Sequence, residues 1–393
     1  MKRISTFFTF FVSIYVILDR YASPIPKVTL SETILLLFWV MFFLSKPRKI
    51  SLEPFLILFC IYLMGYVVMP FTGFINVPSD MVDAVGTPAR LIFLYFSIAV
   101  LGKNLFDISK GIKYIRWVAI VLSGYACLQI IAARFGIYLT TYIPFLPIMS
   151  DINIDEELLQ KAGYGLTFRP CSLLTEPAAL CIYLLCALGL ELFSSKHKYQ
   201  YFNACLFSIV CVLSRSSTGI MITFLVWGLF FIKHPPISAK KFPIGFVMAI
   251  IGSILAVVLV YYSGIWDYFL ERTFHENRFG DFSSSTRFYA IKDMFAASDS
   301  VTGVLFGQGL SNLENYLPGF ARSYLDLGLI GIFIIMAMLF HIYIRGNALQ
   351  RKIILLFIVL NIGTEIILGP FSLLFLCVAI SRISQECQNR KIC

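Results

Sequence analysis

The sequence predicts an all-α, polytopic integral membrane protein, and two observations lead to this fold class. The first is composition. Hydrophobic residues make up 59% of the 393 residues and charged residues only 14%, whereas soluble domains carry about 45–50% apolar and about 25% charged residues. The second is the continuity of the apolar runs, for example 4–18 and 243–264. Strands of a membrane barrel alternate polar and apolar residues, so these runs predict helices.

Twelve apolar segments are candidates for transmembrane helices, because a span needs about 20 mostly apolar residues. They are 4–18, 30–45, 55–73, 89–102, 114–136, 177–193, 199–213, 218–232, 243–264, 324–344, 353–369 and 370–384. The first follows Met1-Lys2-Arg3 without a small-residue cleavage site, so we expect an uncleaved span rather than a signal peptide. The seventh and eighth are short, but basic residues flank the pair on both sides, which requires two crossings.

The charge distribution predicts that both termini are cytoplasmic. With twelve spans, most of the 32 Lys and Arg residues fall on the cytoplasmic side and most of the 22 Asp and Glu residues on the other. The positive-inside rule predicts this skew. The net charge of +10 therefore reports topology, and we expect no nucleic-acid partner.

One transmembrane domain is expected over residues 1–393, with two large periplasmic loops, 137–176 and 265–323, that carry short surface helices. Long loops on one face of a membrane protein indicate binding or chemistry there. No pair of His or Cys residues has metal-ligand spacing, so we expect neither a metal nor a cofactor. Only Cys171 lies on the outer side, which argues against disulfides.

The first loop ends in Arg169-Pro-Cys-Ser-Leu-Leu-Thr-Glu-Pro177, directly before a predicted span. Thr175 or Glu176 can cap that helix, and Pro177 suits its first position. The amino end of a helix attracts anions, and Arg169 lies just upstream of it. The sequence therefore predicts an anion site at this junction.

The second loop is rich in arginine. Arg278 and Arg287 lie close to His275, the only outer histidine, and Arg287 opens a segment with helical spacing of apolar residues. We expect a surface helix over 287–297, capped by the Ser-Thr run before it. Further arginines, Arg90, Arg215 and Arg322, lie at predicted outer helix ends, where they either bind substrate or reach the lipid phosphates.

These features resemble the Wzy-type O-antigen polymerases and, more distantly, the O-antigen ligases. Four motifs carry the resemblance: 169–177, the run Leu-Ser-Arg-Ser-Ser-Thr-Gly at 213–219, Arg287 followed by Gly-Gln-Gly at 307–309, and Ser-Tyr-Leu-Asp-Leu-Gly-Leu-Ile-Gly at 323–331. Ligases usually carry a histidine shortly before the last motif. Residues 310–324 contain none, which favours the polymerase.

The resemblance implies glycosyl transfer at the periplasmic face of the bacterial inner membrane. A glycan on polyprenyl diphosphate is transferred to a sugar hydroxyl of the next lipid-linked repeat unit, and polyprenyl diphosphate leaves. Partners would be this lipid-linked oligosaccharide, membrane lipid, and the flippase and chain-length regulator of the same pathway. A capsule or exopolysaccharide polymerase fits the sequence equally well.

The resemblance also assigns roles to residues. Arg169 and Arg287 would stabilise the departing diphosphate, because a guanidinium binds phosphate oxygens in a bidentate manner. Glu176 is the first candidate for the general base and His275 the second. Substrate-binding residues would be Arg90, Arg215, Arg278, Arg322, Ser172 and Tyr164, although interfacial belts also explain tyrosines. A transporter or flippase is the rival class, but no repeat relates 1–195 to 196–393, and the charges cluster at the outer surface rather than at the midplane.

Overall fold

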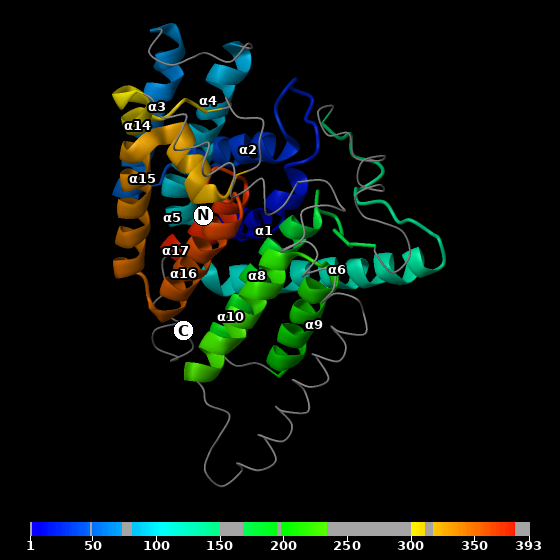
Figure 1. Ribbon diagram of the computed structural model, residues 1–393. Helices are drawn as coiled ribbons and strands as arrows, with labels where there is room; N and C mark the ends of the chain where they lie inside the picture. Colours follow the sequence, from blue (N-terminus) through cyan, green and yellow to red (C-terminus); the bar gives the residue numbers. More distant parts are fainter. Residues whose placement is uncertain are drawn as a thin grey trace.

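The computed structural model describes residues 2–47, 49–72, 81–149, 168–194, 198–233, 300–310 and 317–381. These residues form helices, with isolated β-bridges at Tyr21–Ile148 and Ala22–Thr29 and no strand in the described part (Figure 1). Four described helical segments are long and apolar enough to cross a membrane: Pro54–Phe71, Ala84–Leu105, Ile108–Arg134 and Gly319–Arg345. Further apolar helices have 10–17 residues. The prediction of an all-α membrane protein is thus confirmed at this coarser level.

Eleven of the twelve predicted segments coincide with described helices. These are α1 (Lys2–Leu18), α2 (Leu30–Leu44), α3 (Pro54–Val68), α4 (Met81–Ser97), α6 (Ile108–Arg134), α8 (Pro177–Phe193), α9 (Gln200–Leu213), α10 (Ser217–Lys233), α15 (Gly319–Arg345), α16 (Ala348–Gly363) and α17 (Phe371–Ile380). A π-helix, Ile98–Gly102, and α5 (Lys103–Leu105) extend α4. The segment 243–264 lies outside the described residues, and the count of twelve crossings stays a prediction.

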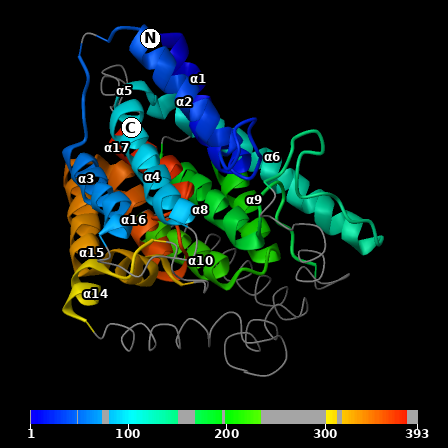
Figure 2. The ribbon, with the colours of Figure 1, turned by 90° about the horizontal axis from the view of Figure 1, so that it is seen from above.

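The centre of the bundle is formed by α8 and α17, which are apolar on all sides. Every residue of α17 is buried, and so is α8 from Ala179 to Leu192. A helix that is hydrophobic all round belongs in a core. Glu191 is the one charged residue of α8. It is buried with the rest of the helix and forms an ion pair with Arg116 of α6. Figure 2 shows α8 among α9, α10 and α16, with α1 and α2 side by side at the periphery.

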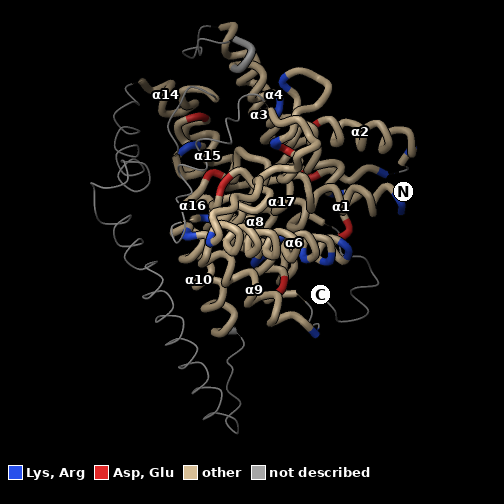
Figure 3. The backbone as a smooth tube through the Cα atoms, turned by 90° about the vertical axis from the view of Figure 1, so that its right-hand side faces the viewer, with Lys and Arg blue, Asp and Glu red and all other residues tan. Residues whose placement is uncertain are grey.

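Peripheral helices expose large apolar side chains along one face. On α2 these are Leu36, Leu37, Val40, Phe43 and Leu44, and on α15 they are Leu329, Phe333, Met336, Phe340 and Ile344. The spacing of three and four residues places each set on one stripe. Figure 3 shows these helices largely free of charged residues. Contiguous apolar surface of this extent requires a cover, and lipid provides one.

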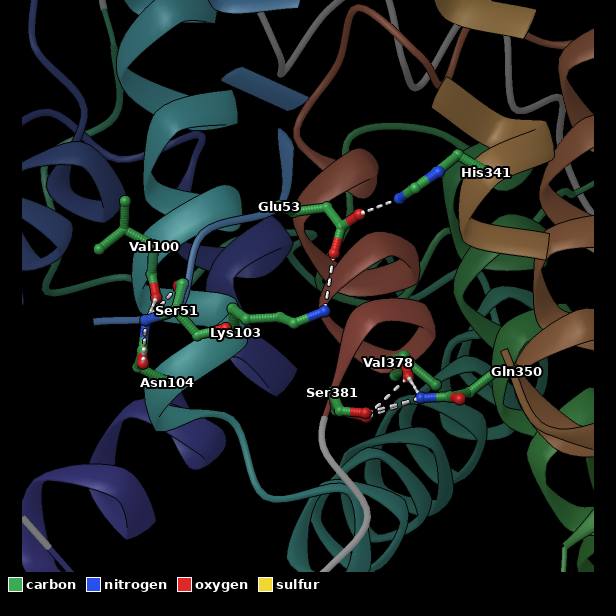
Figure 4. Close-up of polar contacts among 9 residues, drawn as sticks. All are labelled: Ser51, Glu53, Val100, Lys103, Asn104, His341, Gln350, Val378 and Ser381. Atoms are coloured by element: carbon green, nitrogen blue, oxygen red, sulfur yellow. Dashed lines mark hydrogen bonds and ion pairs between the residues drawn. The ribbon is translucent and has the colours of Figure 1, made fainter. Parts of the chain in front are cut away.

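The polar contacts between helices sort into two ends of the bundle, which we name the inner and the outer end. At the inner end, the Glu53 carboxylate lies between Lys103, at 2.7 Å, and His341, at 3.1 Å (Figure 4). Gln350 donates to the Ser381 carbonyl nearby. Glu53, Lys103 and Gln350 belong to segments predicted to be cytoplasmic, and His341 and Ser381 lie near the predicted cytoplasmic ends of their spans. The contacts described below lie in or near segments predicted to be periplasmic. Helices that alternate in direction across a membrane produce this sorting.

Candidate functional site

Arg169 joins the segment before α8 to the turn between α9 and α10. Its Nε donates a hydrogen bond to the Ser214 carbonyl at 3.2 Å. Pro177 takes the first position of α8 and Glu176 the N-cap, as predicted, but the Glu176 side chain makes no capping hydrogen bond. Glu176, the first candidate for the general base, is exposed. It lies at the same helix start as Arg169.

Ser172 fixes the backbone of this segment. It is fully buried and adopts a positive φ of 56°, which is uncommon for a residue with a side chain. Its hydroxyl donates to the Leu122 carbonyl at 2.9 Å, and its N–H donates to the Gln129 side chain at 2.8 Å. Both polar groups of Ser172 are thus occupied by protein partners, and this favours a structural role over the predicted contact with substrate.

A second arginine, Arg20, holds the same segment from the other side. It lies after α1, is 2% exposed, and donates to the Thr141 carbonyl at 2.5 Å and toward the Leu173 carbonyl at 3.5 Å. Both Arg20 and Arg169 interact electrostatically with the buried Cys171. Burial nonetheless raises the pKa of the Cys171 thiol to about 11, so this cysteine packs as a neutral group.

Arg215 lies in the tight turn between α9 and α10. It too has a positive φ, of 53°, and its N–H donates to the Val212 carbonyl at 3.0 Å. The turn is pressed against α8: Sγ of Cys181 lies 2.8 Å from Oγ of Ser214, and a Cβ on Gly219 would come within 2.5 Å of the same sulfur. Close packing of this kind fixes the turn that accepts the Arg169 hydrogen bond.

The chain before α15 packs against a break in that helix. The short helix α14 (Val301–Phe306) ends at Gly307, after which Gln308 and Gly309 donate to the Leu325 and Asp326 carbonyls at 2.6 and 3.2 Å. The break is at Gly328, with φ of 66° and ψ of −173°. The backbone of α14 approaches Gly328 so closely that a Cβ on Gly328 would lie 2.3 Å from the Leu305 carbonyl oxygen.

Two tyrosines of α3 bind the carbonyl group that the break sets free. Tyr62 donates to the Leu327 carbonyl at 2.5 Å, and the Tyr66 hydroxyl lies 3.1 Å from the same oxygen. Tyr66 also contacts the Phe306 carbonyl. A helix interrupted in a membrane needs such partners, because its unpaired backbone groups cannot turn to water.

An acidic and basic cluster lies just before this break. Arg322 and Asp326, one turn apart on α15, form an ion pair at 2.8 Å. Their side chains are 14% and 2% exposed, so Arg322 is mostly buried rather than directed toward lipid phosphates. Glu365, in the connection between α16 and α17, interacts electrostatically with both.

The connection 364–370 joins the two halves of this outer end. The Gly319 N–H, at the start of α15, donates to the Thr364 carbonyl at 3.1 Å. At the end of α16, directly before this connection, a Cβ on Gly363 would lie 3.1 Å from the Thr218 side chain at the start of α10. The starts of α10 and α15 thus both pack around the carboxyl end of α16.

Arg90 belongs to a different group of residues, around the outer ends of α1 and α2. It lies on α4 and reaches Glu32 of α2 at 3.5 Å, with 46% of its side chain exposed. Asp19 next to it accepts hydrogen bonds from the Ser31 and Thr29 hydroxyls, at 2.7 and 3.3 Å. Burial raises the pKa of Asp19 to about 6, with a further rise from Glu32 that Arg90 offsets in part.

Replacement of Asp19 by asparagine tests this burial. In the wild type, the contribution of Asp19 to stability should be greatest below the unfolded pKa of 3.8, should fall as the pH rises through about 6, and should then stay level. The full difference is on the order of 3 kcal/mol, from about two pKa units. The asparagine side chain can still accept both hydroxyls but carries no charge, so this fall should disappear. Thermal unfolding in detergent between pH 4 and pH 8 measures it, and identical pH profiles would contradict the assignment.

Four predicted site residues, Tyr164, His275, Arg278 and Arg287, lie outside the described residues. The structure places Arg169, Glu176 and the buried Ser172 at the start of α8, against the turn that carries Arg215. Arg322 lies with Asp326 near the start of α15, and Arg90 lies with Glu32. It adds Arg20 and Asp326, which the sequence reasoning did not select. Arg20 follows a predicted span and Asp326 lies inside a resembling motif, so their positions could have drawn attention to both.

The outer end can bind an anion, because Arg169, Arg215 and Arg322 lie there on backbone segments that the contacts above fix. Fixed guanidinium groups stabilise developing negative charge without a metal. Among the described residues, no group of three or more His, Cys, Asp or Glu side chains is placed to hold a metal ion. No protein-family model matches the chain, and no curated protein sequence matches it.

Proposed function

We propose that the chain is an O-antigen polymerase-type glycosyltransferase of the bacterial inner membrane. It would join lipid-linked oligosaccharide repeat units of a surface polysaccharide at the periplasmic face. One observation carries the proposal. The described parts of the four motifs meet in two pairs at the outer end. Arg169 of the first motif donates to the Ser214 carbonyl of the second, and Gly309 of the third donates to the Asp326 carbonyl of the fourth. Each pair brings together residues that are distant in the sequence, which supports the proposal.

The proposed reaction breaks the bond between the anomeric carbon of the donor glycan and its diphosphate. Both electrons of that bond leave with the polyprenyl diphosphate, and the acceptor hydroxyl oxygen forms the new glycosidic bond. Negative charge grows on the leaving group, so Arg169, supported by Arg215 and Arg322, would act most strongly in the transition state. Arg287 and Arg278 would complete the set from the second large loop.

The membrane setting suits a substrate with a long lipid chain. The exposed apolar stripes of the peripheral helices would face the lipid, and Arg322 lies near the start of one of these helices, α15. A polyprenyl chain can remain in the bilayer while its diphosphate reaches the outer end. This geometry explains why cations are needed at a helix end rather than in the middle of the bundle, where a transporter would place them.

Deletion of the gene in its host tests the function. A polymerase predicts surface lipid bearing single repeat units, with the ladder of longer chains lost on a gel. Loss of all substituted lipid core, with polymer accumulating on polyprenyl diphosphate, would indicate a ligase. Repeat units that accumulate on the cytoplasmic side would indicate a flippase, and an unchanged ladder would contradict the proposal.

A further inference from the structure

One carboxylate oxygen of Asp326 accepts no hydrogen bond from the described residues. Oδ2 binds Nε of Arg322 at 2.8 Å, whereas Oδ1 is buried and has no hydrogen-bond partner among the described residues. Buried polar groups are almost always paired, because an unpaired one keeps the full cost of leaving water. An ion pair with Arg322 alone does not explain this arrangement, because a buried pair is stable only when its remaining lone pairs are satisfied.

The backbone that carries Asp326 is held from both sides. The Gly309 N–H donates to the Asp326 carbonyl, and the Gln308 N–H donates to the preceding carbonyl of Leu325. Gly307 approaches so closely that a Cβ there would come within 2.6 Å of the Asp326 carbonyl group. Two residues further on, the helix breaks at Gly328. Catalytic groups need supporting contacts of this kind, since small displacements cost large factors in rate.

The surroundings of Asp326 come from three elements. Arg322 is on its own helix, Glu365 is on the connection between α16 and α17, and Tyr66 is on α3; all three interact with it electrostatically. The start of α15 donates to the Thr364 carbonyl, and the start of α10, close to Arg215, packs against Gly363 at the end of α16. Asp326 itself lies beside Arg322, one of the arginines that the proposed function assigns to the diphosphate.

We propose that Asp326 is the general base, and that its Oδ1 receives the proton of the acceptor sugar hydroxyl. This inference rests on the proposed function. As the hydroxyl oxygen bonds to the anomeric carbon, its proton moves to Oδ1, and the electron pair of the broken bond departs with the diphosphate. Asp326 then returns the proton to water. Arg322 holds the carboxylate in position through Oδ2, and its positive charge favours the ionised form.

Asp326 fits this role better than the two residues suggested by the sequence. Glu176 is exposed at the start of α8, and its side chain makes no capping hydrogen bond there. His275 lies outside the described residues. A base contributes about 10²–10⁴-fold to rate, and that contribution requires a fixed acceptor, which Oδ1 provides.

The test compares Asp326→Asn with wild type and with Asp107→Asn. Asp107 caps α6 at the inner end, and asparagine caps helices equally well, so this control removes a carboxylate without touching the site. The purified proteins receive lipid-linked repeat units extracted from the gene-deletion host. Binding is measured separately with undecaprenyl diphosphate in detergent micelles. Asp326→Asn should fold, bind within about twofold of wild type, and lose ~100-fold or more of the transfer rate.

The outcomes separate the inference from the proposed function. Wild-type protein that does not elongate the repeat units would remove the function itself. Active wild type with Asp326→Asn transferring within about tenfold of it would overturn only the role of Asp326, since a base contributes more than this. Parallel loss of binding and transfer would also overturn it. If Asp326→Asn does not fold, the neutral pair Asp326→Asn with Arg322→Gln is compared with Arg322→Gln alone. Misfolding of the double variant would assign Asp326 a structural role. A folded double variant that binds but transfers far more slowly than Arg322→Gln would support the base.

Discussion

Arg169→Lys is expected to abolish polymer formation although it keeps the positive charge. The Arg169 Nε donates to the Ser214 carbonyl, which fixes the guanidinium plane, and the remaining N–H groups of such a plane match two phosphate oxygens at once. An ammonium on a flexible chain supplies neither the fixed plane nor the paired donors. We expect a loss of about 10²-fold or more in transfer, as seen on removal of a transition-state donor. Complementation of the gene deletion and a gel of the surface polysaccharide measure it.

The control for this substitution is Arg134→Lys. Arg134 is an exposed residue at the outer end of α6 and lies outside the contacts described for the site. Its replacement should leave the ladder of polymer lengths intact at equal protein abundance. If Arg169→Lys gave the same ladder as Arg134→Lys, the role of Arg169 at the diphosphate would be wrong.

Gly328→Ala is expected to prevent assembly of the outer end. The residue has a φ of 66°, which disfavours any side chain, and the added Cβ would meet the Leu305 carbonyl oxygen at 2.3 Å. The chain at Gly307, which packs on the same break, would have to move away. We expect a destabilisation of several kcal/mol, or loss of folded protein, because backbone strain and overpacking combine. Thermal unfolding of the detergent-purified protein measures it.

Gly124→Ala provides the matched comparison. Gly124 lies within α6, and a Cβ there would meet no atom within 4 Å. Alanine favours helices by about 1 kcal/mol over glycine, so this protein should be as stable as wild type or more so. Equal stability of the two alanine variants would contradict the tight packing of α14 against the break in α15.

Helix positions could be predicted from the sequence because lipid imposes a single rule, which is that apolar runs form helices. The segment 177–193 was located to the residue, since Pro177 and the preceding polar cap mark its start. Other ends shifted: α15 begins at Gly319 rather than 324, because the residues around Arg322 are helical although they are charged and polar. Hydropathy alone cannot detect a helical turn that carries a buried ion pair.

The candidate site was only partly predictable, because sequence identifies charged residues but not their partners. Arg322 was selected, whereas Asp326, four residues later, became a candidate only when its unused oxygen was seen beside the break at Gly328. The pairing of Arg90 with Glu32, and of Arg20 with the Thr141 carbonyl, depends on helix packing over long sequence separations. Ser172 shows the reverse case. The sequence reasoning assigned it to substrate binding, whereas its burial in the structure shows that it supports the loop.

Reconstitution tests the central proposal most directly. Purified protein in liposomes would receive repeat units linked to undecaprenyl diphosphate, with no other enzyme present, and the products would be separated by length. We predict glycans of two or more repeat units that remain lipid-linked, with one undecaprenyl diphosphate released for each unit added. Repeat units that cross the bilayer without growing, or that stay unchanged in length, would contradict the account.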